Sequence, residues 1–493
     1  MIYKSTRGKG KIVAPSEAIV KGLSEDGGLY IPDHLPKITK DLDELCMMSY
    51  KELAFYIMSM FFDDFSEGEL KTCIDNAYDE KFENPLIAPL NYKNGVYFLE
   101  LYHGRTLAFK DMALSILPHL LKTAAKKIGI DKEIVILTAT SGDTGKAALE
   151  GFDSVEGTKI IVFYPKNGVS EIQKVQMTTQ EGKNTFVVGI DGNFDDAQSG
   201  VKEIFNDRKF NELLNSRGYM FSSANSINIG RLVPQIVYYV YTYASLLKDK
   251  KIGKGEKINI AVPTGNFGNI LAGYYAKVMG IPIDKLICAS NKNNVLTDFI
   301  NTGVYNRNRE FYVTNSPSMD ILISSNLERF LYEISGRDGK IIHSLMNRLQ
   351  LKGEYELNEV MKNELKVLYG GCSGEVETLK AIKEVYDAAD YVIDTHTAVA
   401  YNVYKGYRDK TGDDNVAVIA STASPFKFPK SINEALNFST PNASEFEMIK
   451  DLSSNLGVKM PKGIIGLENK EILHETTCSR EAMREVIKSF LRI

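Results

Sequence analysis

Lys110 lies where a lysine could act as a nucleophile. It stands near the end of the segment YHGRTLAFKD, residues 102–111, and a helix is predicted to begin there and to continue through Leu121. The positive end of a helix dipole disfavours an ammonium group, and the apolar residues at 107–109 would remove water from it. Both effects lower the pKa of a lysine and favour the free amine that attacks carbonyl groups. A lysine at a helix start is otherwise most often a solvated surface residue, so this segment alone leaves both interpretations open.

Two loops that connect a predicted strand to a predicted helix could each bind an anion. The first is TSGDTGK, residues 140–146, between a strand at 133–139 and a helix at 146–152. The second is PTGNFGN, residues 263–269, between a strand at 257–263 and a helix at 270–279. Backbone N–H groups at a helix start attract phosphate or carboxylate, and glycine lets the backbone approach the anion closely. An ordinary glycine-containing turn explains the first loop equally well.

Neither loop has the spacing of a nucleotide-binding motif. A Walker A loop requires Gly at position 140 and Ser or Thr at position 147, where this chain has Thr140 and Ala147. The second loop departs from the GxGxxG pattern of dinucleotide sites. The phosphate of a smaller cofactor therefore fits the second loop better.

Two further polar segments contain groups that could bind a ligand. In SSANSINIGR, residues 222–231, short polar side chains precede Arg231, whose planar fork of donors suits a second phosphate. The alternative for this segment is a polar loop with a surface arginine. In STASP, residues 421–425, a hydroxyl at the end of a strand could hydrogen-bond a ring nitrogen, although such residues more often cap a turn. His103 and His396 lie near these motifs, and we assign neither a catalytic role because buried, hydrogen-bonded histidines are common.

The elements that must position these segments alternate between strands and helices from about Val96 onward, which indicates parallel sheets covered on both faces. In such sheets ligands bind beyond the carboxyl ends of the strands. The first ninety residues are predicted to be mainly helical, with an apolar segment at 50–62 and an amphipathic helix at 67–78 behind Ser66. The tail after Asn437 is predicted to be helical and peripheral. The predicted strands are 133–139, 159–165, 185–191, 257–263, 285–290, 391–394 and 416–421.

Composition excludes several classes of protein. The chain has 493 residues, of which 44% are hydrophobic and 25% charged, with a net charge of −4. This charge predicts no attraction to nucleic acid or to anionic membranes. The five cysteines form no CxxC pair and the histidines no HExxH motif, so we expect neither a disulfide framework nor a metal site. The N-terminus has no apolar run of signal-peptide length, and no apolar stretch approaches the length of a membrane span, ~20 residues. We therefore expect a cytoplasmic protein.

Six motifs, taken in order along the chain, resemble those of the threonine synthase family. They are HGRTLAFKD, TATSGDTG, SSANSIN, PTGNFGN, DTHTAVAY and STASPFKF, and YKSTRG and GLSEDGGLYIP near the start are also similar. The likeness extends from residue 3 to about residue 440. It implies an α/β fold of the tryptophan synthase β-like, fold-type II class, with parallel-rich sheets, and dependence on pyridoxal 5′-phosphate (PLP). It also implies an N-terminal domain at 1–95, a large PLP-binding domain at 96–137 and 235–436, a small mobile domain at 138–234 and a C-terminal helical segment at 437–493.

The resemblance assigns roles to individual residues. It implies that Lys110 binds PLP covalently and that Thr422 contacts its pyridine nitrogen. Asp143 stands where related enzymes often have Asn facing the phenolic oxygen of PLP, so Asp143 must share a proton, turn away or do other work. The loop of Gly265, Asn266, Phe267, Gly268 and Asn269 would bind the cofactor phosphate. The remaining positions would bind substrate, with Ser141, Gly142 and Thr144 at its carboxylate and Asn225, Ser226 and Arg231 at its phosphate.

The implied reaction is a β,γ-replacement in which O-phospho-L-homoserine and water give L-threonine and phosphate. A monomer or a homodimer is expected. Two alternatives stay open at this point. One is a related PLP enzyme that eliminates phosphate, or dehydrates threonine or serine, and releases a keto acid. The other is a phosphoamino-acid binding protein that has kept the fold without the chemistry.

Overall fold

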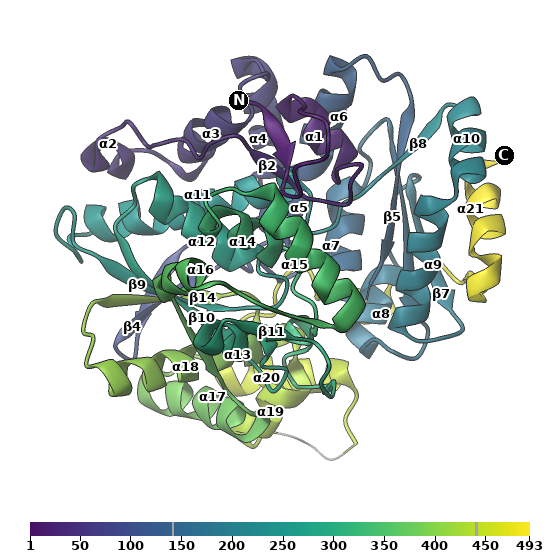
Figure 1. Cartoon of the computed structure of the whole chain (residues 1–493). Helices are drawn as coiled ribbons and strands as arrows, with labels where there is room; N and C mark the ends of the chain where they lie inside the picture. The colour runs from purple at the N-terminus through teal and green to yellow at the C-terminus, as the bar shows by residue number, and fades with distance from the viewer. Residues whose placement is uncertain (141, 439–441) are drawn as a thin grey trace.

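The computed structural model describes residues 1–140, 142–438 and 442–493 of the chain. Two sheets organise these residues, and Figure 1 shows them side by side with helices packed around each. The predicted α/β class with mainly parallel sheets is confirmed. Within these two sheets every strand pair is parallel, except that β3 is antiparallel to β4 in the larger sheet.

The first sheet has six strands in the order β13-β10-β9-β14-β4-β3. Alternate residues of its central strands face different cores, as the two-residue period of a strand requires. Ile260 and Val262 face the core beneath α11 (Ile229–Lys248) and α12 (Gly268–Met279), whereas Ala261 faces the core beneath α18 (Thr395–Thr411). The strands are β3 (Leu90–Lys93), β4 (Val96–Glu100), β9 (Ile258–Pro263), β10 (Ile283–Ser290), β13 (Leu368–Cys372) and β14 (Val416–Ser421).

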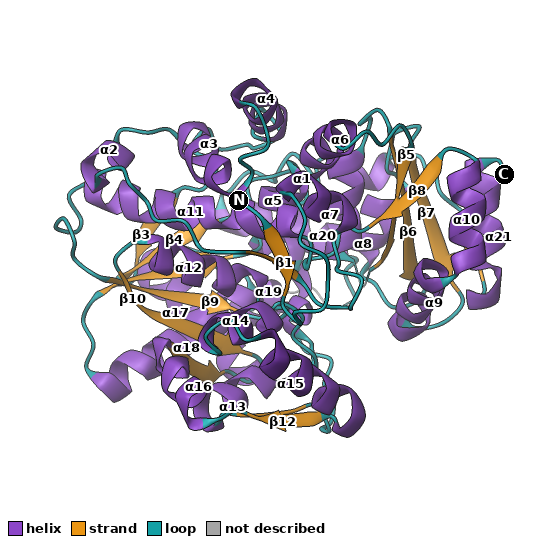
Figure 2. Cartoon of the chain, turned by 45° about the horizontal axis from the view of Figure 1, so that its top comes forward, coloured by secondary structure: helices purple, strands orange, loops and turns teal. Residues whose placement is uncertain are grey.

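The second sheet has five parallel strands in the order β15-β7-β6-β5-β8. One face packs against α7 and α8, and the other packs against α9 and α21, as Figure 2 shows at its right side. The strands are β5 (Glu133–Ala139), β6 (Thr158–Pro165), β7 (Thr185–Ile190), β8 (Tyr219–Ser222) and β15 (Thr477–Cys478).

The N-terminal residues form a short antiparallel pair and several helices above the six-stranded sheet. Strand β1 (Tyr3–Ser5) pairs with β2 (Tyr30–Pro32), and α3 (Tyr50–Phe61) packs against α11. The predicted helix behind Ser66 is confirmed as α4 (Glu67–Ala77). The Ser66 side chain accepts a hydrogen bond from the backbone of Glu69, which caps the helix start.

Helices from many parts of the chain carry or support the candidate site. They are α5 (Asp111–Leu114), α6 (Leu117–Lys127), α7 (Asp143–Phe152), α8 (Glu171–Thr178), α9 (Phe194–Asn206), α11 (Ile229–Lys248), α12 (Gly268–Met279), α14 (Leu327–Ile334) and α18 (Thr395–Thr411). The others are α1 (Pro15–Lys21), α2 (Leu42–Cys46), α10 (Arg208–Ser216), α13 (Val295–Thr302), α15 (Gly339–Lys352), α16 (Glu359–Glu364), α17 (Glu375–Ala389), α19 (Pro429–Leu436), α20 (Glu445–Leu456) and α21 (Met483–Leu491).

Two predicted elements differ from the structure. The helix expected to run from Lys110 to Leu121 is two helices, α5 and α6, separated at residues 115–116. Pro118 explains the break, because a proline ring collides with the carbonyl four residues earlier, here that of Leu114. The predicted strand at 391–394 is an irregular segment, since Asp394 caps the start of α18 and its side chain accepts hydrogen bonds from that helix.

The C-terminal tail is not peripheral, contrary to expectation. Its strand β15 extends the five-stranded sheet beside β7, and α21 packs against the same core. Met483, Ile487 and Leu491 recur every four residues and form the apolar stripe that makes this contact. The division expected between residues 137 and 138 falls inside β5. In the described part of the chain, no helix is long and apolar enough to cross a membrane.

Candidate active site

Lys110 lies at the N-cap of α5 with only 12% of its side chain exposed. Its Nζ is 3.3 Å from Asp143 Oδ2 and 3.3 Å from Ser318 Oγ. Burial lowers the pKa of the Lys110 amine and the cations Lys427 and Arg231 lower it further, although the Asp143 carboxylate acts in the opposite direction. The net effect favours the unprotonated amine that a nucleophilic lysine requires.

Asp143 is the first residue of α7 and is 7% exposed. Its Oδ1 is 3.1 Å from Lys427 Nζ and accepts a hydrogen bond of 2.9 Å from Gln173 Nε2. Its Oδ2 accepts a hydrogen bond of 2.9 Å from Ser318 Oγ. Burial raises the pKa of Asp143, but the charges of Lys427 and Lys110 outweigh burial and hold this pKa well below its usual range. Asp143 is therefore a carboxylate with a lysine side chain on each side.

Ser318 connects Lys110 to a buried histidine. The Ser318 backbone N–H donates a hydrogen bond of 3.2 Å to His396 Nε2. His396 Nδ1 lies 2.7 Å from Asp394 Oδ2, so the ring donates from Nδ1 and accepts at Nε2. His396 thus fixes the backbone position of Ser318, which the sequence did not suggest.

The loop at residues 264–267 leads into α12 with an unusual backbone conformation. Phe267 is buried and adopts φ 63°, a left-handed conformation, immediately before α12. The N–H groups in the first turn of a helix have no partner within the helix and attract an anion. Gly265 has no space for a side chain, because a Cβ there would lie 2.8 Å from the carbonyl oxygen of Ser318. This contact brings the loop next to the residue that hydrogen-bonds Lys110.

Asn269 reinforces the polar character of this helix start. Its Oδ1 accepts hydrogen bonds from the hydroxyls of Tyr238 and Tyr239, at 2.6 and 2.5 Å. Its Nδ2 is buried and has no partner among the described residues. A buried donor without an acceptor is costly, so a ligand acceptor at this point would stabilise the site.

Arg231 is a buried cation in the first turn of α11. It is 4% exposed, its NH1 donates a hydrogen bond of 2.9 Å to the carbonyl of Ala224, and its Nε has no partner among the described residues. Burial lowers the pKa of Arg231 to about 10, and no described carboxylate counteracts this effect. A buried, uncompensated guanidinium is unfavourable unless an anion binds beside it.

Asn326 joins the two anion-binding segments. Its side-chain Nδ2 donates to the carbonyl of Ser226 at 3.1 Å, and its backbone N–H donates to the carbonyl of Asn266 at 3.0 Å. Arg329, completely buried in α14, donates to the Asn326 side chain at 2.6 Å and to the carbonyl of Ile227 at 2.6 Å. These contacts fix the segment before Arg231 against the loop before α12.

Thr422 lies beside the Lys110 segment. Its carbonyl accepts a hydrogen bond of 2.8 Å from the backbone N–H of Phe109, and Ala423 forms a bridge with Ala108. Thr422 is 5% exposed, and its hydroxyl has no hydrogen bond with another described residue. The hydroxyl is therefore available to a ligand next to Lys110.

The structure places the other predicted residues less uniformly. Gly142 is buried with φ 137°, and a Cβ there would collide with the Gln173 side chain, so glycine is required. Thr144 is half-buried in α7, Ser226 is half-buried, and Asn225 is exposed. Ser141 lies outside the described residues.

Several residues of this site cannot be predicted from the sequence. Lys427 belongs to the STASPFKF motif, but the motif does not indicate that its side chain is only 1% exposed. A buried lysine cannot be distinguished from a surface lysine until its partner, here Asp143, is known. Gln173, Ser318 and Asn326 lie in segments with no recognisable motif, and their roles arise only from the fold.

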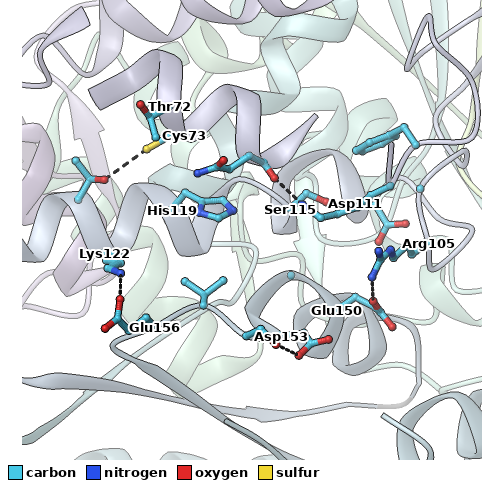
Figure 3. Close-up of a pocket in the computed structure, with 18 of the residues that line it drawn as sticks. Thr72, Cys73, Arg105, Asp111, Ser115, His119, Lys122, Glu150, Asp153 and Glu156 are labelled. Atoms are coloured by element: carbon cyan, nitrogen blue, oxygen red, sulfur yellow. Dashed lines mark hydrogen bonds and ion pairs between the residues drawn. The ribbon is translucent and has the colours of Figure 1, made fainter. Parts of the chain in front are cut away.

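A separate cavity of about 760 Å³ lies between α4, α6 and the end of α7, and Lys110 is not among the residues that line it. Figure 3 shows His119 and Asp111 at its wall, with ion pairs joining Arg105 to Glu150 and Lys122 to Glu156. None of the predicted ligand-binding residues lines it. Its walls also include the buried Asp111, whose pKa burial raises to about 6.

Family models match nearly the whole chain. Residues 2–78 match the threonine synthase N terminus, residues 82–422 match pyridoxal-phosphate dependent enzymes, and residues 397–471 match the threonine synthase C-terminal region. The threonine synthase of Schizosaccharomyces pombe is 38% identical over 467 residues, covering 88% of this chain and 89% of that protein. This chain belongs to the threonine synthase family. The family is PLP-dependent and has the tryptophan synthase β-like fold, as the sequence predicted.

Solved structures of the family superpose on the full chain. The PLP-bound threonine synthase of Brucella melitensis aligns with a TM-score of 0.89 at 33% identity and covers 100% of both chains. The yeast threonine synthase aligns with a TM-score of 0.89 at 32% identity, covering 100% of this chain and 99% of the yeast chain. Human threonine synthase-like 1 is 41% identical over 453 residues, and these span 89% of this chain but 60% of the human protein. This chain is therefore similar both to threonine synthases and to longer proteins whose name leaves their activity open.

Proposed function

We propose that this protein is a threonine synthase, converting O-phospho-L-homoserine and water to L-threonine and phosphate. The observation that carries the proposal is the presence of two separate anion-binding places around one buried amine. The start of α12 is one, and Arg231 is the other, while Lys110 lies close enough to Arg231 for that charge to lower its pKa. A phosphorylated cofactor and a phosphorylated substrate would together occupy both.

The residues present fit PLP. The N–H groups at residues 265–269 and the unpartnered Asn269 amide would hold its phosphate, the Thr422 hydroxyl would face its pyridine nitrogen, and Lys110 would bind it covalently. Asp143 and Ser318 lie beside the Lys110 amine, where the phenolic oxygen of PLP would be near them. A neutral hydroxyl at Thr422 would leave the ring nitrogen largely unprotonated. Bound PLP supplies a sink for the electrons released when the substrate loses its Cα proton.

The protein's own residues would carry out the proton transfers and the binding steps. The Lys110 amine, whose pKa is lowered by burial, would remove the proton from Cα of the substrate and later return it. Ser318, held by His396, would keep that amine oriented. Loss of a Cβ proton and departure of the γ-phosphate would precede addition of water at Cβ, and the departing phosphate could itself move a proton.

Arg231 would bind the γ-phosphate and stabilise it as it leaves. Asn225 and Ser226 precede it, and Asn326 holds this segment against the cofactor loop. Gly142 and Thr144 would bind the substrate carboxylate, because they stand at the start of α7, where Asp143 contacts Lys110. Movement of a small domain at residues 138–234 would exclude water from the early steps and readmit it for the addition at Cβ.

The following features stay predictions: separate N-terminal (1–95), large (96–137 and 235–436) and C-terminal (437–493) units, a cytoplasmic location, and a monomeric or dimeric state.

The product distinguishes the proposed reaction from its alternatives. We expect the PLP-loaded protein with O-phospho-L-homoserine to release phosphate and L-threonine in equal amounts. A phosphate-eliminating lyase would release 2-oxobutyrate instead of threonine. A binding protein without chemistry would change the absorption of bound PLP without releasing phosphate. Formation of 2-oxobutyrate as the main product would reject the proposed function while leaving the PLP site intact.

A further inference from the structure

Asp143 presents an electrostatic problem for the proposed role of Lys110. A buried carboxylate requires a cation nearby, and Lys110 Nζ is only 3.3 Å from Asp143 Oδ2. If Lys110 were the only cation available, the pair would be most stable with Lys110 protonated. A protonated lysine is neither a nucleophile nor a base.

Lys427 provides a second cation for the same carboxylate. It lies in the short helical turn Pro425–Lys427 that follows β14, and its side chain is 1% exposed. Its Nζ is 3.1 Å from Asp143 Oδ1 and donates a hydrogen bond of 2.6 Å to the carbonyl of Thr106. Lys427 therefore contacts one carboxylate oxygen, whereas Lys110 contacts the other.

We propose that Lys427 is a positioning residue that neutralises Asp143 and thereby allows Lys110 to remain a free amine beside a carboxylate. The inference rests on the proposed role of Lys110 as the PLP-binding lysine. It also explains how Asp143 can stand where related enzymes often have Asn, because the Asp143–Lys427 pair has no net charge. Asp143 then stays fixed by Gln173 and Ser318 and presents no uncompensated negative charge to the cofactor.

The other charged groups near the pair are consistent with this arrangement. Lys427 lowers the pKa of Asp143 more than Lys110 does, and Lys427 also lowers the pKa of Lys110. Arg231 lowers the pKa of Lys110 in the same way. His396 accepts a hydrogen bond at Nε2 from the Ser318 backbone and contacts Asp394 through Nδ1. Lys427 thus gives Asp143 an ion-pair partner other than Lys110.

Charge removal at Lys427 tests the inference through the reactivity of Lys110. The full-length protein, with PLP removed, would be labelled with trace acetic anhydride from pH 6 to 11, and acetylation of Lys110 would be measured by mass spectrometry. We expect the midpoint of Lys110 reactivity to lie below that of an ordinary lysine and to rise by about one pH unit or more in Lys427→Met. Lys430→Met, which removes an exposed lysine three residues away, should leave the midpoint unchanged.

A double variant separates charge compensation from a general loss of structure. Asp143→Asn leaves the Lys427 ammonium buried without its partner, whereas Asp143→Asn combined with Lys427→Met removes both charges. We expect the double variant to melt at a higher temperature than either single variant and to have a Lys110 midpoint at or below that of the wild type. If Lys427→Met does not fold, these two measurements on the double variant decide the question.

Two results would overturn the inference. One is a Lys110 midpoint that is unchanged in Lys427→Met, and the other is a double variant that is as unstable as the worse single variant. Neither measurement involves substrate, so failure of the proposed function is recognised independently. If the protein forms threonine but Lys427→Met leaves the Lys110 midpoint unchanged, only this inference is rejected.

Discussion

The amine of Lys110 lies 3.3 Å from a carboxylate oxygen of Asp143, and each residue stands at the start of a helix. The two helices, α5 and α7, are in direct contact, because a Cβ added at Gly151 in α7 would collide with the carbonyl of Leu114 in α5. Helix α7 packs on the five-stranded sheet, whereas Thr422, at the end of the six-stranded sheet, contacts the Lys110 segment. The candidate site therefore combines residues that depend on both sheets.

Replacement of Lys110 by Ala is expected to abolish threonine formation without unfolding the protein. The Lys110 Nζ contacts Asp143 and Ser318, and α5 begins without a side-chain cap from Lys110. PLP should still bind noncovalently through its phosphate. Borohydride reduction followed by mass spectrometry of the intact protein should attach PLP to the wild type and not to the variant. Retention of more than a trace of wild-type turnover would show that Lys110 is not the reactive lysine.

Replacement of Arg231 by Ala is expected to lower kcat/KM for O-phospho-L-homoserine. The expected loss of transition-state stabilisation is about 2–4 kcal/mol, the cost of removing one partner of a buried charged pair. The absorption of bound PLP before substrate is added should not change, because Lys110 and the residues at 265–269 remain. Arg208→Ala, at an exposed position in α10, serves as the control. A loss smaller than about threefold would place Arg231 outside the substrate site.

Replacement of Gly265 by Ala is expected to weaken PLP binding. The new methyl group would lie 2.8 Å from the carbonyl oxygen of Ser318, so either the cofactor loop or Ser318 must shift. Gly406→Ala is a matched control, because a Cβ at Gly406 in α18 would meet no atom within 4 Å. We expect the dissociation constant of PLP, measured by fluorescence titration, to rise at least tenfold in Gly265→Ala, about 1.4 kcal/mol. Equal PLP affinity in both variants would contradict the geometry of this loop.

His119 in the cavity of Figure 3 is expected to make the protein less stable in mild acid. Burial lowers the pKa of His119 to about 4, with the cations Lys81 and Lys122 contributing and Asp79 opposing. Between pH 6.5 and 4 the unfolded chain would bind a proton at this residue that the folded chain does not. Its contribution is therefore present above pH 6.5 and is lost as the pH falls, by up to about 3 kcal/mol.

The free energy of unfolding in urea at pH 7 and at pH 4.5 measures this contribution. His119→Gln should lose less stability over this interval than the wild type does. His34→Gln, which changes an exposed histidine, should behave like the wild type. The same loss in wild type and His119→Gln would mean that the surroundings of His119 do not lower its pKa.

Most strands and the connecting loops of this protein could be predicted from local patterns. The strand at 133–139 and its following turn, and the loop at 263–269, are recognisable because apolar runs end abruptly in Gly, Ser, Thr and Asn. The segment at 391–394 is not the strand that its sequence predicts. A short apolar run beside Asp394 fits either a strand or the residues that lead to a helix cap. Short runs of this kind are decided by tertiary contacts, not by periodicity.

The candidate site was only half predictable for a similar reason. Lys110 and Arg231 stand in motifs whose spacing suggests a helix start, and the structure shows both buried. The partners that set their protonation come from distant segments: Lys427 is separated from Asp143 by most of the chain, and Ser318 is supplied by a turn without any motif. Spacing along the sequence carries no information about such contacts.

The source of the hydroxyl oxygen in the product tests the central claim most directly. The PLP-loaded protein would be incubated with O-phospho-L-homoserine in ¹⁸O-labelled water, and the products would be examined by mass spectrometry. A β,γ-replacement breaks the carbon–oxygen bond and adds water at Cβ, so we expect threonine with one ¹⁸O in its hydroxyl group and phosphate without ¹⁸O. Homoserine with ¹⁸O-labelled phosphate, or 2-oxobutyrate without threonine, would contradict the assignment of this chain as a threonine synthase.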